Sequence, residues 1–146
     1  MADVEIAVRW EGRGLEFVAR GKSGQEMRVD GDTRSATSPV ETLLVSLATC
    51  MAADIVDIAN KMRLPIAALD VAASGMRNPE PPRRYLSARL VFTVAGVSDE
   101  EAPKLDRALE LSRDKYCSVI HTLRQDLPVE LVLVRSDRNA AIEGAR

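Results

Sequence analysis

The sequence predicts an α+β fold with the element order βββ-α-ββ-α-β, a largely antiparallel sheet and two long helices. Three observations lead to this prediction: short runs joined by glycine turns, two long helical stretches, and a β-rich segment between them. The chain has 146 residues, a length that favours a single domain, so we take residues 1–146 as one domain. A chain of this size hides roughly 68–70% of its unfolded surface on folding, which is enough for a sizeable core.

Three short strands are expected near the N-terminus, within residues 4–9, 15–20 and 25–30. The first of them alternates weakly between apolar and polar residues, which is typical of a strand with one covered face. Glycine-containing turns at 10–14 and 21–24 separate the three runs. This arrangement predicts a meander of hairpins.

A first helix is expected from Ser38 to about Arg63. Ser38 suits the N-cap and Pro39 the first helical position, while Glu41 completes a capping box. Pro65 blocks continuation of the helix.

The middle of this helix, residues 43–59, is apolar nearly all round rather than striped. A helix of that kind must be covered on most sides. A small domain covers one or two faces of such a helix but hardly all of them. We therefore infer that a second subunit covers the remaining face.

Two further strands, a second helix and a last strand complete the chain. The two strands are expected at 66–77 and 83–97, joined by a proline-rich loop at 78–82 that cannot form strand interior. The second helix is expected at about 99–126, and the last strand at 129–135.

The second helix has two candidate start signals: a capping box of Ser98 with Glu101, or Pro103 in the first turn. Its predicted core stripe repeats at spacings of three and four and consists of Leu105, Leu109, Ser112, Tyr116, Val119 and Leu123. The polar tail, residues 136–146, is expected to be frayed.

The composition excludes several classes of protein. Twenty basic and 22 acidic residues give a net charge of −2, whereas nucleic-acid binders usually carry a basic excess. Two cysteines and one histidine do not make a disulfide scaffold, and they cannot by themselves supply a four-ligand zinc site.

The N-terminus has no basic segment followed by an apolar one, so no secretory signal is expected. The apolar run inside residues 43–59 is broken by polar residues, and a membrane span needs about 20 predominantly apolar residues. We expect a cytoplasmic protein that does not insert into membranes. Thiols are kept reduced in that compartment, where a disulfide is usually transient, catalytic or redox-sensing.

The two cysteines, Cys50 and Cys117, fall one on each predicted helix. Free cysteines in helices are most often small buried hydrophobes, and the functional alternative is a redox pair brought together by helix packing. Asp54 and Asp57 lie on nearly the same helical face as Cys50, and carboxylates disfavour a nearby thiolate. A reactive Cys50 therefore needs a cation from elsewhere in the fold.

Three arginines of the N-terminal hairpins are candidates for that cation: Arg9, Arg13 and Arg20. We select Arg13 because it lies in a glycine-flanked turn, from which a loop can reach a site. For each of the three, a solvated surface position is the simpler interpretation.

Cys117 has His121 four residues further on, which places both on one face of a regular helix. A cysteine and a histidine so placed can form a catalytic dyad. The simpler alternative is a surface or capping histidine. Glu41 is likewise interpreted first as a capping residue and second as a site carboxylate.

Two stretches together resemble the OsmC/Ohr family, the osmotically inducible protein C and organic hydroperoxide resistance proteins. One runs from Ser38-Pro39-Val40-Glu41 to Ala48-Thr49-Cys50, and the other is Leu111-Ser112-Arg113-Asp114-Lys115-Tyr116-Cys117-Ser118-Val119. The element order is also similar, so the resemblance covers about residues 4–135.

The resemblance implies an intertwined homodimer whose two central helices are buried between sheets. It further implies a thiol peroxidase without metal, haem or other cofactor. By analogy, Cys50 attacks the peroxide to give a sulfenic acid and Cys117 resolves it as a disulfide, which a dithiol reductant then reduces. A mostly apolar site at the dimer interface would favour organic hydroperoxides.

This chain departs from the well-studied branch of the family. The site glutamate there lies ten residues before the first cysteine, a position that Val40 occupies here, and Glu41 is nine before. Nine residues make about two and a half turns of a regular helix, so Glu41 would lie on the side of the helix opposite Cys50. The chain is therefore more similar to the OsmC-like branch, and two alternatives stay open: a non-catalytic small-molecule-binding protein and a redox sensor.

Overall fold

The computed structural model describes residues 2–136. Within it the chain forms two compact units, Met1–Leu43 and Leu44–Arg146. The predicted fraying of the tail falls on residues that, except for Ser136, lie outside the described part of the chain.

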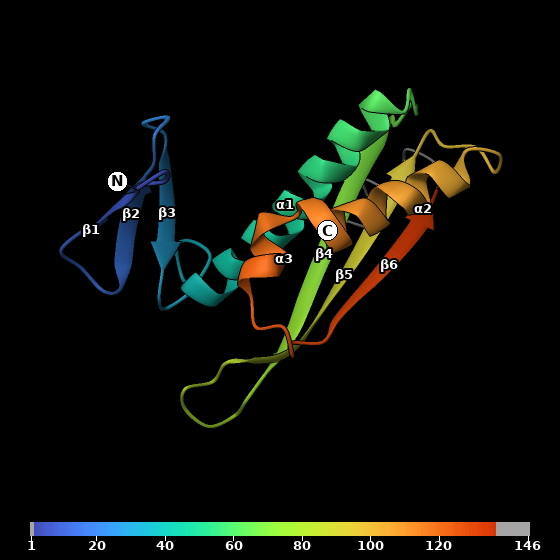
Figure 1. Cartoon of the computed structure of the whole chain (residues 1–146). Helices are drawn as coiled ribbons and strands as arrows, with labels where there is room; N and C mark the ends of the chain where they lie inside the picture. Colours follow the sequence, from blue (N-terminus) through green and yellow to red (C-terminus); the bar gives the residue numbers. More distant parts are fainter. Residues whose placement is uncertain (1, 137–146) are drawn as a thin grey trace. The chain divides into compact units, whose positions relative to one another are not determined.

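The first unit is a three-stranded antiparallel sheet in the order β1-β2-β3 (Figure 1). Its strands are β1 (Ala7–Trp10), β2 (Glu16–Arg20) and β3 (Glu26–Asp30). The predicted meander is thus confirmed, although β1 begins three residues later than expected. Gly12 and Gly14 in the first turn have φ values of +82° and +48°, which an L side chain rarely adopts, so glycine is required there.

Asp30 holds together the loop that follows β3. Its carboxylate accepts hydrogen bonds from the backbone N–H groups of Asp32, Arg34 and Ser35, and from the Ser35 hydroxyl, at 2.9–3.0 Å. Asp30 is only 2% exposed. The hydrogen bonds from Ser35 and Asp32 contribute most to lowering the pKa of the Asp30 carboxyl to about 2.

The first helix, α1 (Pro39–Lys61), begins where the sequence predicts. The Ser38 N–H donates to Glu41 Oε2 at 2.7 Å, and the Glu41 N–H donates to Ser38 Oγ at 3.3 Å. This is the expected capping box. The hydrogen bonds from Ser38 lower the pKa of the Glu41 carboxyl.

The second unit contains a sheet in the order β4-β5-β6, with strands β4 (Ala68–Arg77), β5 (Tyr85–Ala95) and β6 (Val129–Arg135). β4 pairs antiparallel with β5, whereas β6 pairs parallel with it. The parallel pairing requires a crossover, which the helices between β5 and β6 provide. Three of the four strand pairings in the two sheets are antiparallel, in agreement with the predicted α+β class.

The core of the second unit lies between this sheet and the helices that cover one of its faces (Figure 1). Leu90, Phe92 and Val94 alternate along β5 and are fully buried, as expected for one face of a strand. They pack with residues of α1 and α2 in one cluster. The members from the two helices are Leu47, Ala48, Met51, Ile55, Ala59, Leu105 and Leu109.

The second helix is not continuous, and the prediction of a single helix over 99–126 was wrong. It consists of α2 (Ala102–Leu111), a π-helical turn η1 (Ser112–Tyr116) and α3 (Ser118–Thr122). The wider turn rotates the chain relative to a regular helix. Tyr116, expected in the core stripe, is therefore 48% exposed, and Cys117 is fully buried instead.

Of the two candidate start signals, Pro103 marks the beginning of the helix, whereas Ser98 and Glu101 are hydrogen-bonded but lie before it. Glu101 Oε2 accepts hydrogen bonds from the N–H and the hydroxyl of Ser98. α2 itself begins at Ala102, with Pro103 in its first turn.

α1 is the one helix among the described residues whose length and composition would allow it to cross a membrane, with a mean hydropathy of 1.7 over its most apolar window. Only 28% of that window is buried within the chain. The core helix of a soluble protein meets the same criteria. Val45 and Val56 are 47% and 41% exposed, so part of the apolar surface of α1 is uncovered.

Replacing Asp30 by Asn should lower the thermal unfolding midpoint at neutral pH by several degrees, because the amide presents N–H groups where the loop also presents N–H donors. The effect depends on pH with a definite sign. The carboxyl pKa is about 2 in the folded chain against 3.8 ordinarily, so its stabilisation is complete above pH 3.8 and is lost as the pH falls through about 2.

The midpoints of wild type and Asp30→Asn should therefore converge on acidification, as followed by circular dichroism from pH 7 to pH 2. Asp32→Asn changes an exposed carboxylate in the same loop and serves as the control. A constant difference between wild type and Asp30→Asn over this range would contradict the assignment.

Candidate functional site

Three side chains of the second unit form a compact cluster: Cys50, Asp54 and Cys117. The two Sγ atoms and a carboxylate oxygen of Asp54 all lie within 4.8 Å of one another. Cys50 and Asp54 are one helical turn apart on α1, and Cys117 follows η1. Helix packing thus brings together two cysteines that are 67 positions apart in the sequence.

Cys117 does not lie inside a helix, as had been expected, but at the junction between η1 and α3. Its backbone is extended, with φ −69° and ψ 104°. Its N–H donates to the Ser112 carbonyl at 2.8 Å, which closes the π-helical turn. Its Sγ accepts a hydrogen bond from the N–H of Ile120 at 3.4 Å and so caps α3.

Burial makes Cys117 a thiol at neutral pH. The side chain is fully buried in the core, and this desolvation is the main reason why the pKa of Cys117 rises to about 11. The Ile120 N–H acts in the opposite direction, and the neighbouring Cys50 raises the value further. Cys117 therefore needs a proton acceptor before it can act as a nucleophile.

Cys50 differs from Cys117 in its access to solvent. Cys50 is half-buried and packs against the edge of the core cluster, whereas Cys117 belongs to the cluster itself. A reagent from solution therefore reaches Cys50 more readily.

Asp54 is fixed by Ser112, whose hydroxyl donates to Asp54 Oδ2 at 2.8 Å. Ser112 is fully buried and Asp54 is half-buried, so this part-buried hydrogen bond joins the first residue of η1 to α1. Sequence reasoning placed Asp54 near Cys50 only as an unfavourable charge, and Ser112 only in the core stripe. The four-residue spacing of Cys50 and Asp54 was the available signal.

His121 does not pair with the sulfur of Cys117. Its Nδ1 lies 2.7 Å from the Cys117 carbonyl oxygen, and its Nε2 lies 3.2 Å from the Asp114 carbonyl oxygen. The dyad considered from the sequence is therefore not formed, and the ring caps backbone carbonyls, which was the alternative.

Arg13 lies in the β1–β2 turn of the first unit, with an exposed side chain whose Nε donates to Glu16 Oε2 at 2.7 Å. This hydrogen bond raises the pKa of the guanidinium further. The two other candidate arginines, Arg9 and Arg20, also have carboxylate partners within their own sheet. Glu41, the remaining candidate, caps α1 as described above.

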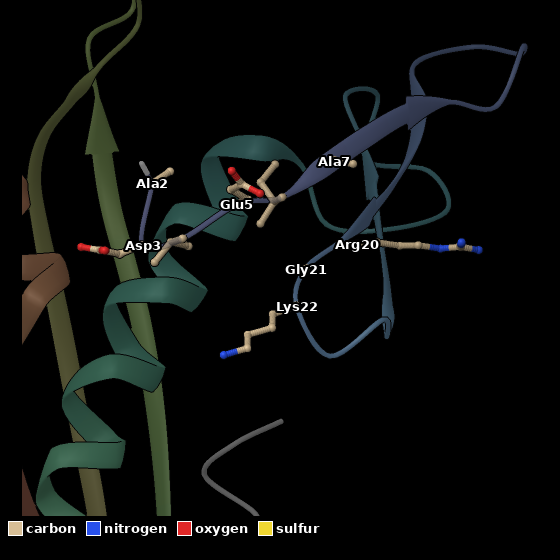
Figure 2. A pocket seen from close by; sticks show the side chains of 9 residues that line it. Ala2, Asp3, Glu5, Ala7, Arg20, Gly21 and Lys22 are labelled. Atoms are coloured by element: carbon tan, nitrogen blue, oxygen red, sulfur yellow. The ribbon is translucent and has the colours of Figure 1, made fainter.

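A separate surface pocket of about 930 Å³ lies in the first unit, and sequence reasoning did not anticipate it. Figure 2 shows the residues that line it, which come from the N-terminal segment and from the end of β2: residues 2–7 and 20–22. Neither cysteine contributes to this pocket.

Comparison with known proteins identifies relatives of this chain. The profile of OsmC-like proteins matches residues 30–132. Protein YhfA of Escherichia coli K12 is 34% identical over 117 residues, which cover 80% of this chain and 86% of YhfA.

Two solved structures illustrate how far the likeness in fold extends. A hypothetical protein from Aquifex aeolicus superposes with a TM-score of 0.81 at 22% identity, over 94% of this chain and 99% of that one. An organic hydroperoxide resistance protein OsmC from Legionella pneumophila superposes with a TM-score of 0.64 at 15% identity, over 92% and 98% of the two chains. The profile match and the identity to YhfA go beyond a shared fold, and the chain therefore belongs to the family of OsmC-like proteins.

Proposed function

We propose that this protein is a thiol peroxidase that reduces organic hydroperoxides through a two-cysteine cycle and acts in oxidative-stress defence. The observation that carries the proposal is the approach of the Cys50 and Cys117 sulfurs to within 4.8 Å beside a carboxylate. Membership of the OsmC-like family supports a stress-related redox role.

The different burial of the two cysteines gives each a role. Cys50 is half-buried and is the thiolate that attacks the terminal oxygen of the hydroperoxide. The S–O bond forms as the O–O bond breaks, and the leaving alkoxide takes a proton from water to become the alcohol. Cys50 becomes a sulfenic acid, so the thiol is oxidised by two electrons and the peroxide is reduced.

Cys117 then resolves the sulfenic acid. Its sulfur attacks the Cys50 sulfur, the S–S bond forms, and the hydroxide leaves as water once it receives the Cys117 proton. Because the pKa of Cys117 is about 11, this proton needs a carrier. Asp54, within 4.8 Å of both sulfurs, accepts it and passes it to the departing hydroxide.

A small dithiol completes the cycle by thiol–disulfide exchange with the Cys50–Cys117 disulfide. The disulfide needs the sulfurs at about 2.05 Å, a change that rotation of the two side chains supplies. The reducing cytoplasm is the compartment in which such a dithiol is available.

We further propose that the protein works as a homodimer. The support is the uncovered apolar surface of α1, where a hollow is lined by Ala52, Ala53, Val56, Asp57, Asn60 and Leu69. All four residues of β1 are exposed as well. A second copy of the chain would bury these surfaces and would give the site apolar walls that suit organic hydroperoxides.

We propose that Arg13 is the cation that stabilises the Cys50 thiolate. To do so, it would leave Glu16, with which it now forms an ion pair. Glu41 enters the proposal through the capping box that sets the start of α1.

Replacing Cys50 by Ser should reduce consumption of cumene hydroperoxide to the rate without protein, because the attacking sulfur is lost.

Cys117→Ser should still consume one equivalent per chain and should stop as a sulfenic acid that dimedone traps. Asp54→Asn should slow disulfide formation, whereas Asp106→Asn, which changes an exposed carboxylate on α2, should not. Stopped-flow measurement checks each variant, with dithiothreitol to follow turnover and without any reductant to count the single equivalent that Cys117→Ser consumes.

Equal rates for wild type and Cys50→Ser would rule out the peroxidase. Oxidation of one equivalent with no later turnover in wild type would instead favour the redox sensor.

Arg13→Ala should slow the reaction of Cys50 with cumene hydroperoxide roughly tenfold, since a cation that favours the thiolate is removed. Arg20→Ala is the matched control, because Arg20 is an arginine of the same sheet that also pairs with a glutamate. The second-order rate constant, measured with reduced protein, separates the two variants. If Arg20→Ala and Arg13→Ala react alike, Arg13 has no special role.

The mass in solution should be twice the chain mass of 15.9 kDa, as measured by light scattering after gel filtration. Val56→Glu should shift the protein towards the monomer, because it places a charge on the uncovered face of α1. Lys104→Glu alters an exposed charge on α2 and should leave the mass unchanged. A monomeric mass for wild type at micromolar concentration would contradict the homodimer.

A further inference from the structure

We propose that the reduced cluster of Cys50, Asp54 and Cys117 binds one zinc ion per chain. The proposal concerns the residues of the suggested peroxidase site, but zinc binding itself depends only on the side-chain cluster. Release of the ion on oxidation is a second step, and that step rests on the proposed peroxidase function.

The geometry of the cluster is close to that of a zinc site. Zinc binds thiolate sulfur at about 2.3 Å and carboxylate oxygen at about 2.0–2.2 Å, so donors in a tetrahedral shell lie roughly 3.5–3.8 Å apart. The three donor atoms here all lie within 4.8 Å of one another. Small side-chain rotations are enough to close the remaining distance.

The chemistry of the donors favours zinc over other divalent ions. Two thiolates select a soft or borderline metal and disfavour Mg²⁺ and Ca²⁺, which prefer oxygen ligands. Two sulfurs and one oxygen make three protein ligands, and the fourth tetrahedral position is left for water or a small exogenous ligand. The two cysteines supply two of these ligands and Asp54 supplies the third.

Two of the three donors are already oriented by neighbours, as ligands of metal sites usually are. The buried Ser112 hydroxyl donates to Asp54 Oδ2 at 2.8 Å, and the Ile120 N–H donates to Cys117 Sγ at 3.4 Å. Both contacts place positive hydrogen atoms at donor atoms that become anionic when they bind a metal. A divalent ion in turn offsets the negative charge that the two thiolates and the carboxylate bring together.

Oxidation would release the ion. When an organic hydroperoxide converts the two thiolates to a disulfide, it takes up two electrons and two protons and yields an alcohol and water. Zinc itself is not oxidised or reduced, but both of its sulfur ligands are lost, and one carboxylate does not retain it.

The test is a titration of the reduced full-length protein with Co²⁺, a spectroscopic substitute for zinc, followed by displacement with Zn²⁺. We expect saturation at one equivalent per chain, a thiolate-to-cobalt charge-transfer band, and the intense visible bands of tetrahedral cobalt. Zinc should also protect the half-buried Cys50 thiol of wild type from alkylation by iodoacetamide, a measurement that needs no variant.

Variants assign the ligands. Cys50→Ser should weaken the charge-transfer band by about half, because one of the two sulfurs is removed. Ser112→Ala should weaken zinc binding about 10- to 100-fold, the usual effect of losing a group that orients a ligand, and Asp54→Asn should weaken it at least as much. Asp106→Asn, which changes an exposed carboxylate on α2, is the matched control and should bind as wild type does. Circular dichroism establishes that each variant is folded.

Absence of one-to-one binding by reduced wild type would overturn the proposal, as would equal affinity of Asp54→Asn and Asp106→Asn. Oxidised wild type, with its disulfide formed by cumene hydroperoxide, should bind no cobalt. If the reduced protein binds cobalt but cumene hydroperoxide forms no disulfide, the peroxidase function fails and the zinc site stands. If the disulfide forms but the reduced protein binds no cobalt, the zinc site fails and the peroxidase function stands.

Discussion

The hydrogen bond from the Ser112 hydroxyl to the Asp54 carboxylate, 2.8 Å long, is the interaction on which the cysteine site depends. It joins α1 to the beginning of η1 in the interior of the second unit. The π-helical turn that starts at Ser112 directs Cys117 into the core in place of Tyr116. An apolar residue in place of Asp54 would leave the buried Ser112 hydroxyl without this partner.

Local sequence patterns were sufficient for much of the fold. Ser38 and Glu41 marked the beginning of α1 because a capping box requires those residue types at that spacing. The strand expected at 83–97 corresponds to β5, and its Leu90, Phe92 and Val94 are buried in the structure. The two cysteines were singled out because they are scarce, and the structure brings them together.

Other features depend on contacts between distant segments, and no local pattern contains them. The spacing of Leu105, Leu109 and Ser112 continues regularly to Tyr116, so it predicts an uninterrupted helix. The π-helical turn forms because the Cys117 N–H reaches back to the Ser112 carbonyl, while the Ser112 hydroxyl is engaged by Asp54, 58 positions earlier in the chain. The position of Asp54 beside the Cys117 sulfur could not be predicted for the same reason.

The parallel pairing of β5 with β6 has a consequence for the order of events during synthesis. β5 ends at Ala95, but its parallel neighbour begins only at Val129, and Cys117 lies in the crossover between them. A nascent chain therefore exposes Cys50 on α1 well before the crossover can close over it, because non-local pairing waits for the later strand. Until Cys117, 67 positions after Cys50, has been added and its segment has packed on α1, Cys50 is an isolated thiol and the two sulfurs cannot meet.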